Sequence, residues 1–240
     1  MVDIHCHILP GFDDGSDNFE ESVRMAHIAV ESGTKAIIVT PHSNIPDSYQ
    51  NYCDQYYLDT FNALKERIEE EDIPLQLYAG HEIYASGDIV GTLKEKKLLT
   101  LCDSRYPLIE FPFKMKSEKV YNKLRELVAA GFTPVVAHPE RYAFVVEDDM
   151  APVRLRDMGC LLQINKGSLK GSFGRDAHMV AHSLVRNELA DFVASDAHSP
   201  YTRNTYLTDA YEILCDISSV DYADLLMSIN PRKVIRNEKI

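Results

Sequence analysis

The sequence predicts an α/β protein in which parallel strands form a closed or distorted barrel. Three observations support this prediction: short apolar runs alternate with amphipathic stretches, the connections are mostly short, and glycine-rich nucleotide-binding loops are missing. The last observation disfavours an open doubly wound sheet, because neither G-x-G-x-x-G nor G-x-x-x-x-G-K-[ST] occurs. Since the chain has 240 residues and no linker or repeat, we expect one domain over residues 1–240.

Seven short apolar runs are expected to be strands, because β-branched residues are frequent in them and turn signals follow them. They lie at 2–6, 36–40, 75–79, 107–111, 134–138, 160–164 and 191–195. Helices are expected between and after them, at about 18–33, 49–71, 88–99, 117–130, 147–158, 175–188 and 203–217. In the first helix, Phe19, Val23, Ala26 and Val30 form one apolar stripe, and Gly33 follows as a stop signal. This alternation of strand and helix predicts a parallel sheet.

The composition is that of an ordinary globular protein, with 45% hydrophobic and 26% charged residues. The formal net charge of −12 argues against binding to nucleic acids or anionic membranes, since both favour a basic surface. No apolar run approaches the roughly 18 residues of a membrane span, and the first residues do not resemble a signal peptide. We therefore expect a cytoplasmic protein without membrane insertion.

The five cysteines are expected to be reduced structural thiols, because their number is odd and no C-x-x-C pair is present. None of them has an arginine six positions downstream, so the C-x₅-R loop of cysteine-dependent phosphatases is absent. The G-x-S-x-G motif of serine hydrolases is absent as well. The sequence therefore indicates neither of these nucleophiles.

The first predicted strand carries an H-x-H pair, His5 and His7. Side chains alternate faces along a strand, so both imidazoles are expected on one face and Cys6 on the other. Two imidazoles in this arrangement can reach one metal ion. The alternative, which the pair alone leaves open, is that both histidines cap the strand through hydrogen bonds.

Six of the seven predicted strands have a histidine or a carboxylate at or just past their ends. The ends of parallel strands meet on one face of a barrel, so we expect these side chains to form one site. They offer nitrogen and oxygen ligands but no thiolate, which suits Mn²⁺, Fe or Zn²⁺, and they are too numerous for one ion. The candidates are His5, His7, Asp13, Asp14, His42, His81, Glu82, Glu110, His138, Asp196 and His198.

The stretches "DIHCHILPGFDDG", "TPH", "HEI", "EFPF", "AHPERY" and "SDAH" resemble, in order and spacing, the PHP (polymerase and histidinol phosphatase) superfamily. Within it, the chain is similar to the manganese-dependent protein-tyrosine phosphatases of bacterial capsule and exopolysaccharide operons. The likeness covers nearly the whole chain. It implies an α/β fold of the PHP type, a distorted (β/α)₇ TIM-like barrel, with a trinuclear metal site.

The resemblance also implies a role for each matching residue. Two to three Mn²⁺ ions are expected, with Fe or Zn as alternatives. The first would be held by His5, His7, Glu82 and Asp196. Glu82 would bridge to a second ion, completed by Glu110 and His138, and a third would be held by Asp14, His42 and His198. Arg141 and Arg203 match the phosphate-binding arginines of the family. Asp13 remains an alternative to Asp14, and Ser43 and His81 depart from common family versions.

The function implied by the resemblance is a phosphotyrosine-protein phosphatase that acts on a bacterial tyrosine autokinase and regulates polysaccharide synthesis. Two alternatives stay open: a small-molecule phosphatase, such as histidinol-phosphate phosphatase, and a non-catalytic metal-binding PHP module. Other candidates are expected to be structural. His178 and His182 have helical i, i+4 spacing but lack the glutamate of H-E-x-x-H. Tyr49, Tyr52, Tyr56 and Tyr57 are expected to pack on a helix surface, with the lining of a cleft for an aromatic substrate as the alternative.

Overall fold

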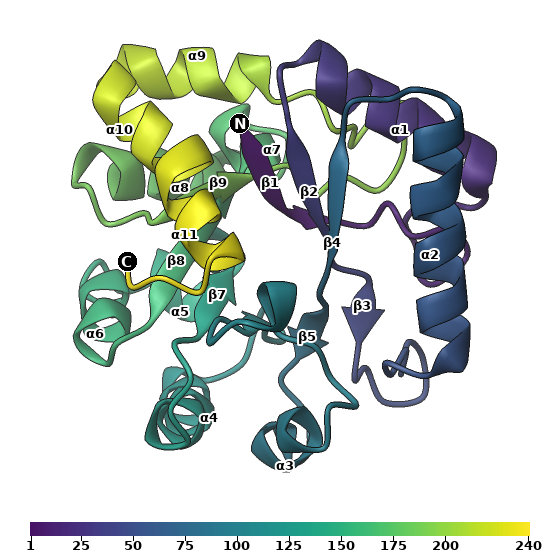
Figure 1. The fold of residues 1–240 in the computed structure, drawn as a ribbon. Coiled ribbons are helices and arrows are strands. Elements are labelled where there is room, and N and C mark those ends of the chain that lie inside the picture. Colours follow the sequence, from purple (N-terminus) through teal and green to yellow (C-terminus); the bar gives the residue numbers. More distant parts are fainter.

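The computed structural model describes residues 1–240 and confirms the α/β class (Figure 1). It contains nine parallel strands, where the sequence predicted seven. They are β1 (Val2–Cys6), β2 (Ala36–Val39), β3 (His42–Ser43), β4 (Gln76–Ala79), β5 (Glu82–Tyr84), β6 (Leu108–Glu110), β7 (Val135–Ala137), β8 (Leu161–Asn165) and β9 (Phe192–Ala194). All seven predicted runs form strands. The two additional strands, β3 and β5, directly follow β2 and β4.

The strands form two parallel sheets, with the orders β1-β2-β4 and β3-β5-β6-β7-β8-β9. The chain leaves the first sheet after β2 and after β4, and each time joins the second within two residues. Pro41 interrupts the first of these runs, because proline has no N–H for a ladder. The second run is interrupted at Gly80 and His81. Each predicted strand ends at one of these breaks, and the short strand that resumes after it was not predicted.

The two sheets also meet at β1 and β9. The Asp196 N–H donates to the His5 carbonyl and the His7 N–H donates to the Ala197 carbonyl, both at 2.9 Å. A single bridge pairs Cys6 with Ala197. No ladder joins β4 to β6; the short helix η1 (Leu101–Asp103) contacts β4 instead. The strand arrangement is thus that of a distorted barrel.

Alternate residues of the strands face two different environments, as a barrel requires. Ala36 and Ile38 of β2 pack in one cluster with Leu108 of β6, whereas Ile37 packs outward with the first two helices. The inner cluster has twelve buried residues drawn from β1, β2, β6, β7 and β9, with η1 and the C-terminal helix. Three outer clusters bind the surrounding helices to the strands.

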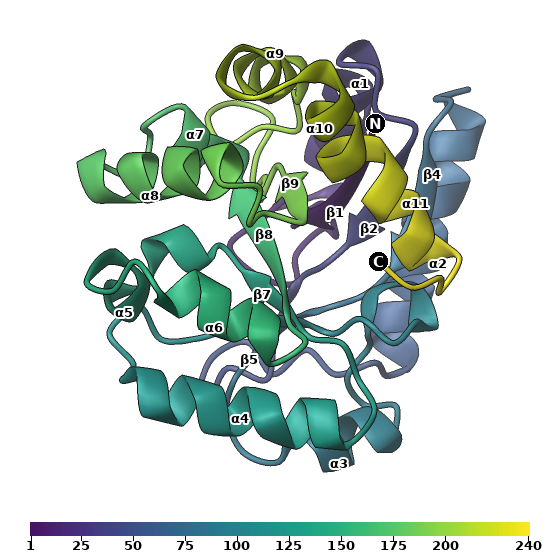
Figure 2. The same ribbon diagram turned by 90° about the vertical axis from the view of Figure 1, so that its left-hand side faces the viewer.

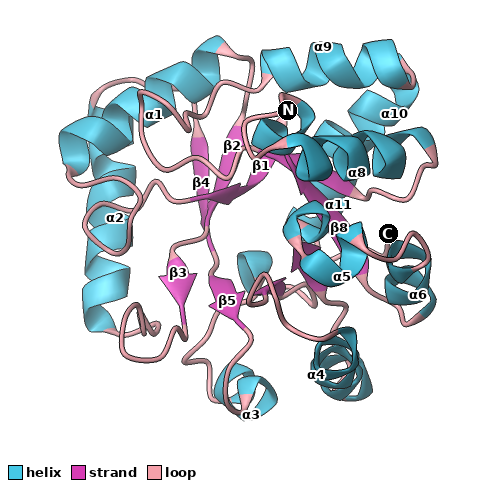
Figure 3. Cartoon of the chain, turned by 180° about the vertical axis from the view of Figure 1, so that it is seen from behind, coloured by secondary structure: helices cyan, strands magenta, loops and turns pink.

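Helices surround the strands on the outside (Figures 1 and 3). The longer ones are α1 (Phe19–Glu31), α2 (Gln55–Glu70), α4 (Ser117–Ala129), α8 (Arg175–Arg186) and α9 (Thr208–Ile217). The short ones are α3 (Ile89–Lys94), η2 (Pro139–Arg141), α5 (Ala143–Val146), α6 (Ala151–Asp157), α7 (Lys166–Leu169), α10 (Val220–Asp224), η3 (Leu225–Ile229) and α11 (Asn230–Ile235). None of them is both long and apolar enough to cross a membrane.

Several predicted helix boundaries were wrong. The helix predicted from residue 49 begins at Gln55, because the Asp54 carboxylate caps it by accepting the Tyr57 N–H at 2.9 Å. The helix predicted from residue 203 begins at Thr208, and the one predicted at 147–158 is confined to α6. The sequence did not predict α10, η3 and α11. η3 contacts the first and last strands and α11 contacts the first, on the side where β1 begins (Figure 2), while α10 packs on η3.

Candidate metal centre

The centre of the site is the H-x-H pair at the end of β1. The Nε2 atoms of His5 and His7 lie 3.2 Å apart, and Cys6 packs in an outer cluster, so the predicted alternation is confirmed. The Glu82 carboxylate from β5 lies 3.3 Å from both Nε2 atoms. Asp196, just after β9, lies 3.4 Å from both. All four side chains are nearly inaccessible to solvent.

The far nitrogens of the two imidazoles show why a cation fits between them. His5 Nδ1 lies 2.9 Å from Gln163 Oε1, and His7 Nδ1 lies 2.7 Å from a carboxylate oxygen of Asp13. Both partners are acceptors, so each neutral ring carries its proton on Nδ1. The two Nε2 lone pairs then point at each other and at two carboxylates. A positive ion is the group that satisfies such a donor set.

A second group of ligands lies beside the first. His138, which follows β7, places Nε2 3.0 Å from Glu82 Oε1 and 3.7 Å from Glu110 Oε1. On the other side, His42 Nδ1 lies 2.8 Å from Glu82 Oε2 and 3.6 Å from Glu110 Oε2. The structure thus brings Glu82, Glu110 and His138 together, as expected, and adds His42 to them.

A third group lies where the site opens to solvent. The Nε2 atoms of His42 and His198 are each 3.5 Å from Asp14 Oδ1. His198 Nδ1 lies 3.1 Å from the Asp196 carbonyl, so its Nε2 also presents a lone pair toward a carboxylate. His7 belongs to this group as well, and the four ligand atoms lie within 4.8 Å of one another. The three expected sets of ligands are therefore adjacent.

The charges of the site favour cations. Burial alone would lower the pKa of His5, but Glu82 and Asp196 raise it to about 9. Burial and repulsion from Glu82 raise the pKa of Glu110 to about 8. Both shifts favour a cation here: the buried carboxylates stabilise a positive charge brought among them, while burial and their mutual repulsion resist further negative charge.

The two adjacent aspartates have different environments. The Asp13 side chain is fully buried, and it accepts the His42 N–H at 2.7 Å and the Gly15 N–H at 2.9 Å as well as contacting His7. Asp14 is 55% exposed and faces the third group. Asp13 therefore orients His7 and the loop, while Asp14 is the aspartate that is free to bind an ion.

Sequence reasoning missed the contribution of β8, which supplies neither histidine nor carboxylate. Gln163 donates to Asn165 Oδ1 at 2.8 Å, and Asn165 donates to Asp196 Oδ2 at 2.5 Å. Together with the contact to His5, these two amides connect two expected ligands of the first ion. The available signal was the alternation of polar Gln163 and Asn165 with apolar Leu162 and Ile164 in a buried strand.

Two arginines reach the edge of the site. Arg203 Nη2 lies 2.7 Å from Asp196 Oδ2, and Arg141 Nη1 lies 3.8 Å from the same atom. Two aromatic rings flank the Arg141 guanidinium: Phe113 at 4.5 Å and Phe173 at 4.3 Å from its carbon. Such cation–π contacts hold a guanidinium in one plane and leave its N–H groups free for an anion.

Comparison with known proteins places this chain in a family. The family model described as "Capsular polysaccharide synthesis, CpsB/CapC" matches residues 1–236. The chain belongs to the CpsB/CapC family. It is 36% identical to the tyrosine-protein phosphatase YwqE of Bacillus subtilis (strain 168), covering 100% of this chain and 93% of that protein. It is 31% identical to the tyrosine-protein phosphatase CpsB of Streptococcus pneumoniae, and both chains are covered completely.

Solved structures agree with this assignment. One from a study of YwqE from Bacillus subtilis and CpsB from Streptococcus pneumoniae, described as unique metal-dependent tyrosine phosphatases, superimposes with a TM-score of 0.92. Its sequence identity is 37%, over 100% of this chain and 96% of that one. A lactonase from Listeria monocytogenes, only 12% identical, matches with a TM-score of 0.63 over 99% of this chain and shares the fold.

Ser43 and His81 support loops outside the metal centre. The Ser43 hydroxyl lies 2.9 Å from the Gln50 carbonyl and 3.0 Å from that of Asn51, which fastens the loop before α2. His81 Nδ1 accepts the Leu99 N–H at 3.0 Å, and burial lowers the pKa of this ring to about 3. A neutral His81 that accepts a backbone N–H lies outside the three groups of ligands, and the resemblance assigns it no metal ion.

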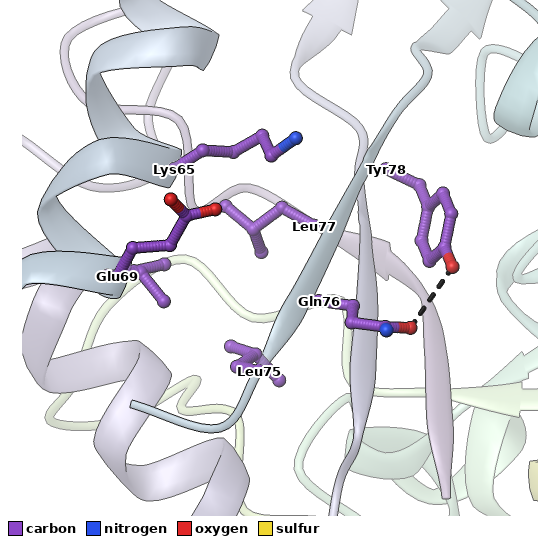
Figure 4. A pocket seen from close by; sticks show the side chains of 7 residues that line it. Lys65, Glu69, Leu75, Gln76, Leu77 and Tyr78 are labelled. Carbon is purple, nitrogen blue, oxygen red and sulfur yellow. Dashed lines mark hydrogen bonds between the residues drawn. The ribbon is translucent and has the colours of Figure 1, made fainter. Parts of the chain in front are cut away.

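Of the other residues set aside on the sequence, Tyr49 stacks on the His42 ring with centroids 6.1 Å apart, and Tyr57 is fully buried, so the expected packing on a helix surface was wrong for these two tyrosines. The two helical histidines lie outside the centre. His178 and His182 contact the carbonyls of Ser168 and Leu169 at 3.2 and 3.1 Å. A shallow pocket between α2 and β4, lined by Lys65 and Tyr78 among others, contains none of the expected ligands (Figure 4).

Proposed function

We propose that this chain is a metal-dependent protein-tyrosine phosphatase acting in capsular or extracellular polysaccharide synthesis, and that residues 1–240 form its single domain. Membership in the CpsB/CapC family supports this proposal, since its relatives YwqE and CpsB carry the name tyrosine-protein phosphatase. The geometry supports the same reaction class, because ligands for several cations adjoin two arginines.

The observation that carries the proposal is the position of Arg141 and Arg203 at Asp196. Guanidinium groups stay protonated and do not bind metal ions, so a site that only stores metal has no use for them. Paired arginines at a cation site instead suit a phosphomonoester dianion, whose oxygens accept several charge-assisted hydrogen bonds. A phosphatase is the interpretation that uses both features.

We propose Mn²⁺ as the native metal, with two to three ions held by the ligands of the three groups. The first ion would be bound by His5, His7, Glu82 and Asp196. The second would share Glu82 and be completed by Glu110 and His138, and the third would be bound by Asp14, His42 and His198. The donors are imidazole nitrogens and carboxylate oxygens without thiolates, a set that suits Mn²⁺ and also Fe or Zn²⁺.

Each part of the chain then has a defined task in the reaction. When bound, the divalent ions supply Lewis acidity, which provides hydroxide near neutral pH and offsets charge on phosphoryl oxygens. Arg141 and Arg203 bind and orient the phosphate, and they stabilise the charge that spreads over its equatorial oxygens. Phe113 and Phe173 hold Arg141 in position. Asp13, Gln163 and Asn165 keep the ligands of the first ion oriented.

The proposed substrate is a phosphotyrosine protein, most specifically a bacterial tyrosine autokinase of the polysaccharide export system. A phenolate leaves more readily than an alkoxide, since the pKa of a free tyrosine is about 10, so little help from a general acid is needed. Histidinol phosphate would require an alkoxide to leave. The geometry gives no specific support to that alternative.

The test is a comparison of kcat/KM for a phosphotyrosyl peptide and for histidinol phosphate, with Mn²⁺ added and after chelation. We expect turnover of the peptide to be faster, to require metal, and to return when Mn²⁺ is restored. Faster turnover of histidinol phosphate would reassign the substrate. Absence of turnover on every phosphomonoester in the presence of metal would refute the phosphatase proposal.

A further inference from the structure

A cavity of about 430 Å³ lies beside the metal centre and is not used by the proposed reaction. We call it the Lys166 cavity; its charged lining consists of Lys166, Lys170, Arg203 and Asp209. It adjoins the site, because Arg203 lines it and also contacts Asp196 at 2.7 Å. A group bound in this cavity would therefore lie next to a phosphate held by the two arginines.

The lining of the Lys166 cavity is basic in a protein that is acidic overall. Three cationic side chains face one carboxylate, while the whole chain has a formal charge of −12. The remaining lining is mostly small and polar, with Ser172, Thr202 and Asn204 among it. Such a concentration of positive charge attracts an anion locally, even when the net charge of the protein repels it.

Lys166 is the unusual residue of this lining, because its charge is buried and unpaired. Its exposed fraction is 6%. The ammonium donates to Asn204 Oδ1 at 2.9 Å and to the Tyr206 carbonyl at 2.7 Å, which are both neutral, and it forms no ion pair. Burial lowers its pKa. Buried charges are normally paired, and an ammonium with two acceptors still has one N–H to donate.

The other two cations differ in how well they are neutralised. The Lys170 ammonium pairs with the Asp209 carboxylate. Arg203 pairs with Asp196 through Nη2, but its buried Nε has no hydrogen-bond partner. Lys166 and Arg203 thus each retain a donor that the protein itself does not satisfy. An anion that reaches Lys166 would be bound without breaking the existing pairs, whereas the buried Arg203 Nε needs a side-chain shift to meet it.

We propose that the Lys166 cavity is a subsite for a carboxylate that the substrate carries near its phosphotyrosine. The inference rests on the proposed function and adds a specificity: phosphotyrosyl segments with an acidic neighbour are preferred over neutral ones. Asp209 limits this preference by neutralising Lys170. An alternative occupant with the same chemistry is free inorganic phosphate, which the experiment separates from a side chain.

The test uses phosphotyrosyl peptides that carry Glu or Gln at each flanking position in turn, and the readout is the Glu/Gln ratio of kcat/KM. We expect the wild-type ratio to reach about three- to tenfold at one or more positions, the range for a partly exposed charged contact. Lys170→Gln should lower this ratio, and Asp209→Asn should raise it. Lys166→Met should lower it further, provided that its melting temperature shows a folded protein.

Lys65→Gln is the matched control, because it removes the same charge at the distant pocket of Figure 4 and should leave the ratio unchanged. Equal ratios in the wild type and all variants would overturn the subsite. The subsite would also be overturned if the variants changed only the inhibition by inorganic phosphate and not the Glu/Gln ratio, since the cavity would then bind a free anion. Turnover of free phosphotyrosine by the wild type tests the proposed phosphatase function separately. A failure of the subsite can therefore be distinguished from a failure of the proposed function.

Discussion

At the scale of single residues, Arg141 and Arg203 distinguish catalysis from metal storage. Replacing either with Ala should remove a charge-assisted contact to the phosphate and cost about 2–4 kcal/mol of transition-state stabilisation. This corresponds to roughly a 30- to 1,000-fold loss of kcat/KM on a phosphotyrosyl peptide. Metal content should stay near the wild-type value. Arg154→Ala is the control, because that arginine pairs with Asp148 at an exposed place. Full activity in both active-site variants would exclude the phosphate-binding role.

The neighbouring residues Asp13 and Asp14 should respond differently to the loss of their charge. Asp14→Asn should remove a ligand and lower the metal content by one ion. Asp13→Asn should keep the stoichiometry but weaken metal binding by about 10–100-fold, since it disturbs the orientation of His7. Metal titration followed by elemental analysis measures both. Identical titrations for the two variants would contradict this division of roles.

The sequence could predict the residue types of the site but not which of two neighbours binds an ion. All nine expected metal ligands lie in the three adjacent groups, because parallel strand ends converge whatever the details of packing. The burial of Asp13, the backbone contact of His81 and the amides of β8 depend on tertiary packing. A pattern of residue types carries little information about such packing.

At the scale of elements, the loop after β1 positions Asp13 and Asp14, and Gly15 allows it to pass close to the strand. A Cβ at Gly15 would overlap the His7 carbonyl oxygen and lie 2.5 Å from the His7 Cβ, so the backbone would have to move. Gly15→Ala should therefore lower the free energy of unfolding by about 1–3 kcal/mol, and it should also reduce metal content.

Gly131→Ala provides the comparison for this prediction. That glycine has a φ of +93°, and no atom lies within 4 Å of the position that a Cβ would take. Its substitution therefore strains the backbone without approaching any ligand. It should lower the melting temperature but leave metal content intact. If Gly15→Ala binds metal as the wild type does, the loop does not position the ligands.

β1 provides a further prediction, because its side chains alternate between two faces and Cys6 therefore points away from His5 and His7. Burial raises the pKa of the Cys6 thiol well above its usual range, which makes it a poor nucleophile. Cys6→Ser should therefore retain most of the phosphatase activity, and iodoacetamide should not inactivate the wild type. Loss of turnover in a folded, metal-loaded Cys6→Ser protein would indicate cysteine chemistry instead.

Helices with a strong apolar periodicity were predicted well, whereas elements that form only through pairing or packing with other parts of the chain were not. The spans of α1, α4 and α8 agree with their apolar stripes to within about two residues. β3 and β5 are two and three residues long, and they exist because they pair in the second sheet. The C-terminal helices cover the start of β1, a role that their own sequence does not reveal. Local pattern therefore predicted the class of fold, while long-range pairing decided its two-sheet form.

At the scale of the whole molecule, the metal centre joins the two sheets. His5 and His7 lie at the end of β1 in the first sheet, whereas Glu82, Glu110 and His138 lie at strand ends of the second sheet. Without cations, four carboxylates and several imidazoles crowd together in a buried place, where like charges repel. Bound ions would hold the strand ends of both sheets together, so metal should stabilise the entire fold.

Chelation should consequently destabilise the protein as well as abolish its activity. A ligand present at 100 times its Kd stabilises the native state by about 2.7 kcal/mol, if it does not bind the unfolded chain. For a protein of this size, that corresponds to a decrease in melting temperature of roughly 5–11 °C when the metal is removed. The measurement is thermal unfolding with and without chelator, followed by Mn²⁺ addition. Chelation should change the melting temperature of Glu82→Gln less than that of the wild type, because Glu82 contacts ligands from both sheets. An unchanged melting temperature after complete removal of metal would mean that the ions do not connect the sheets.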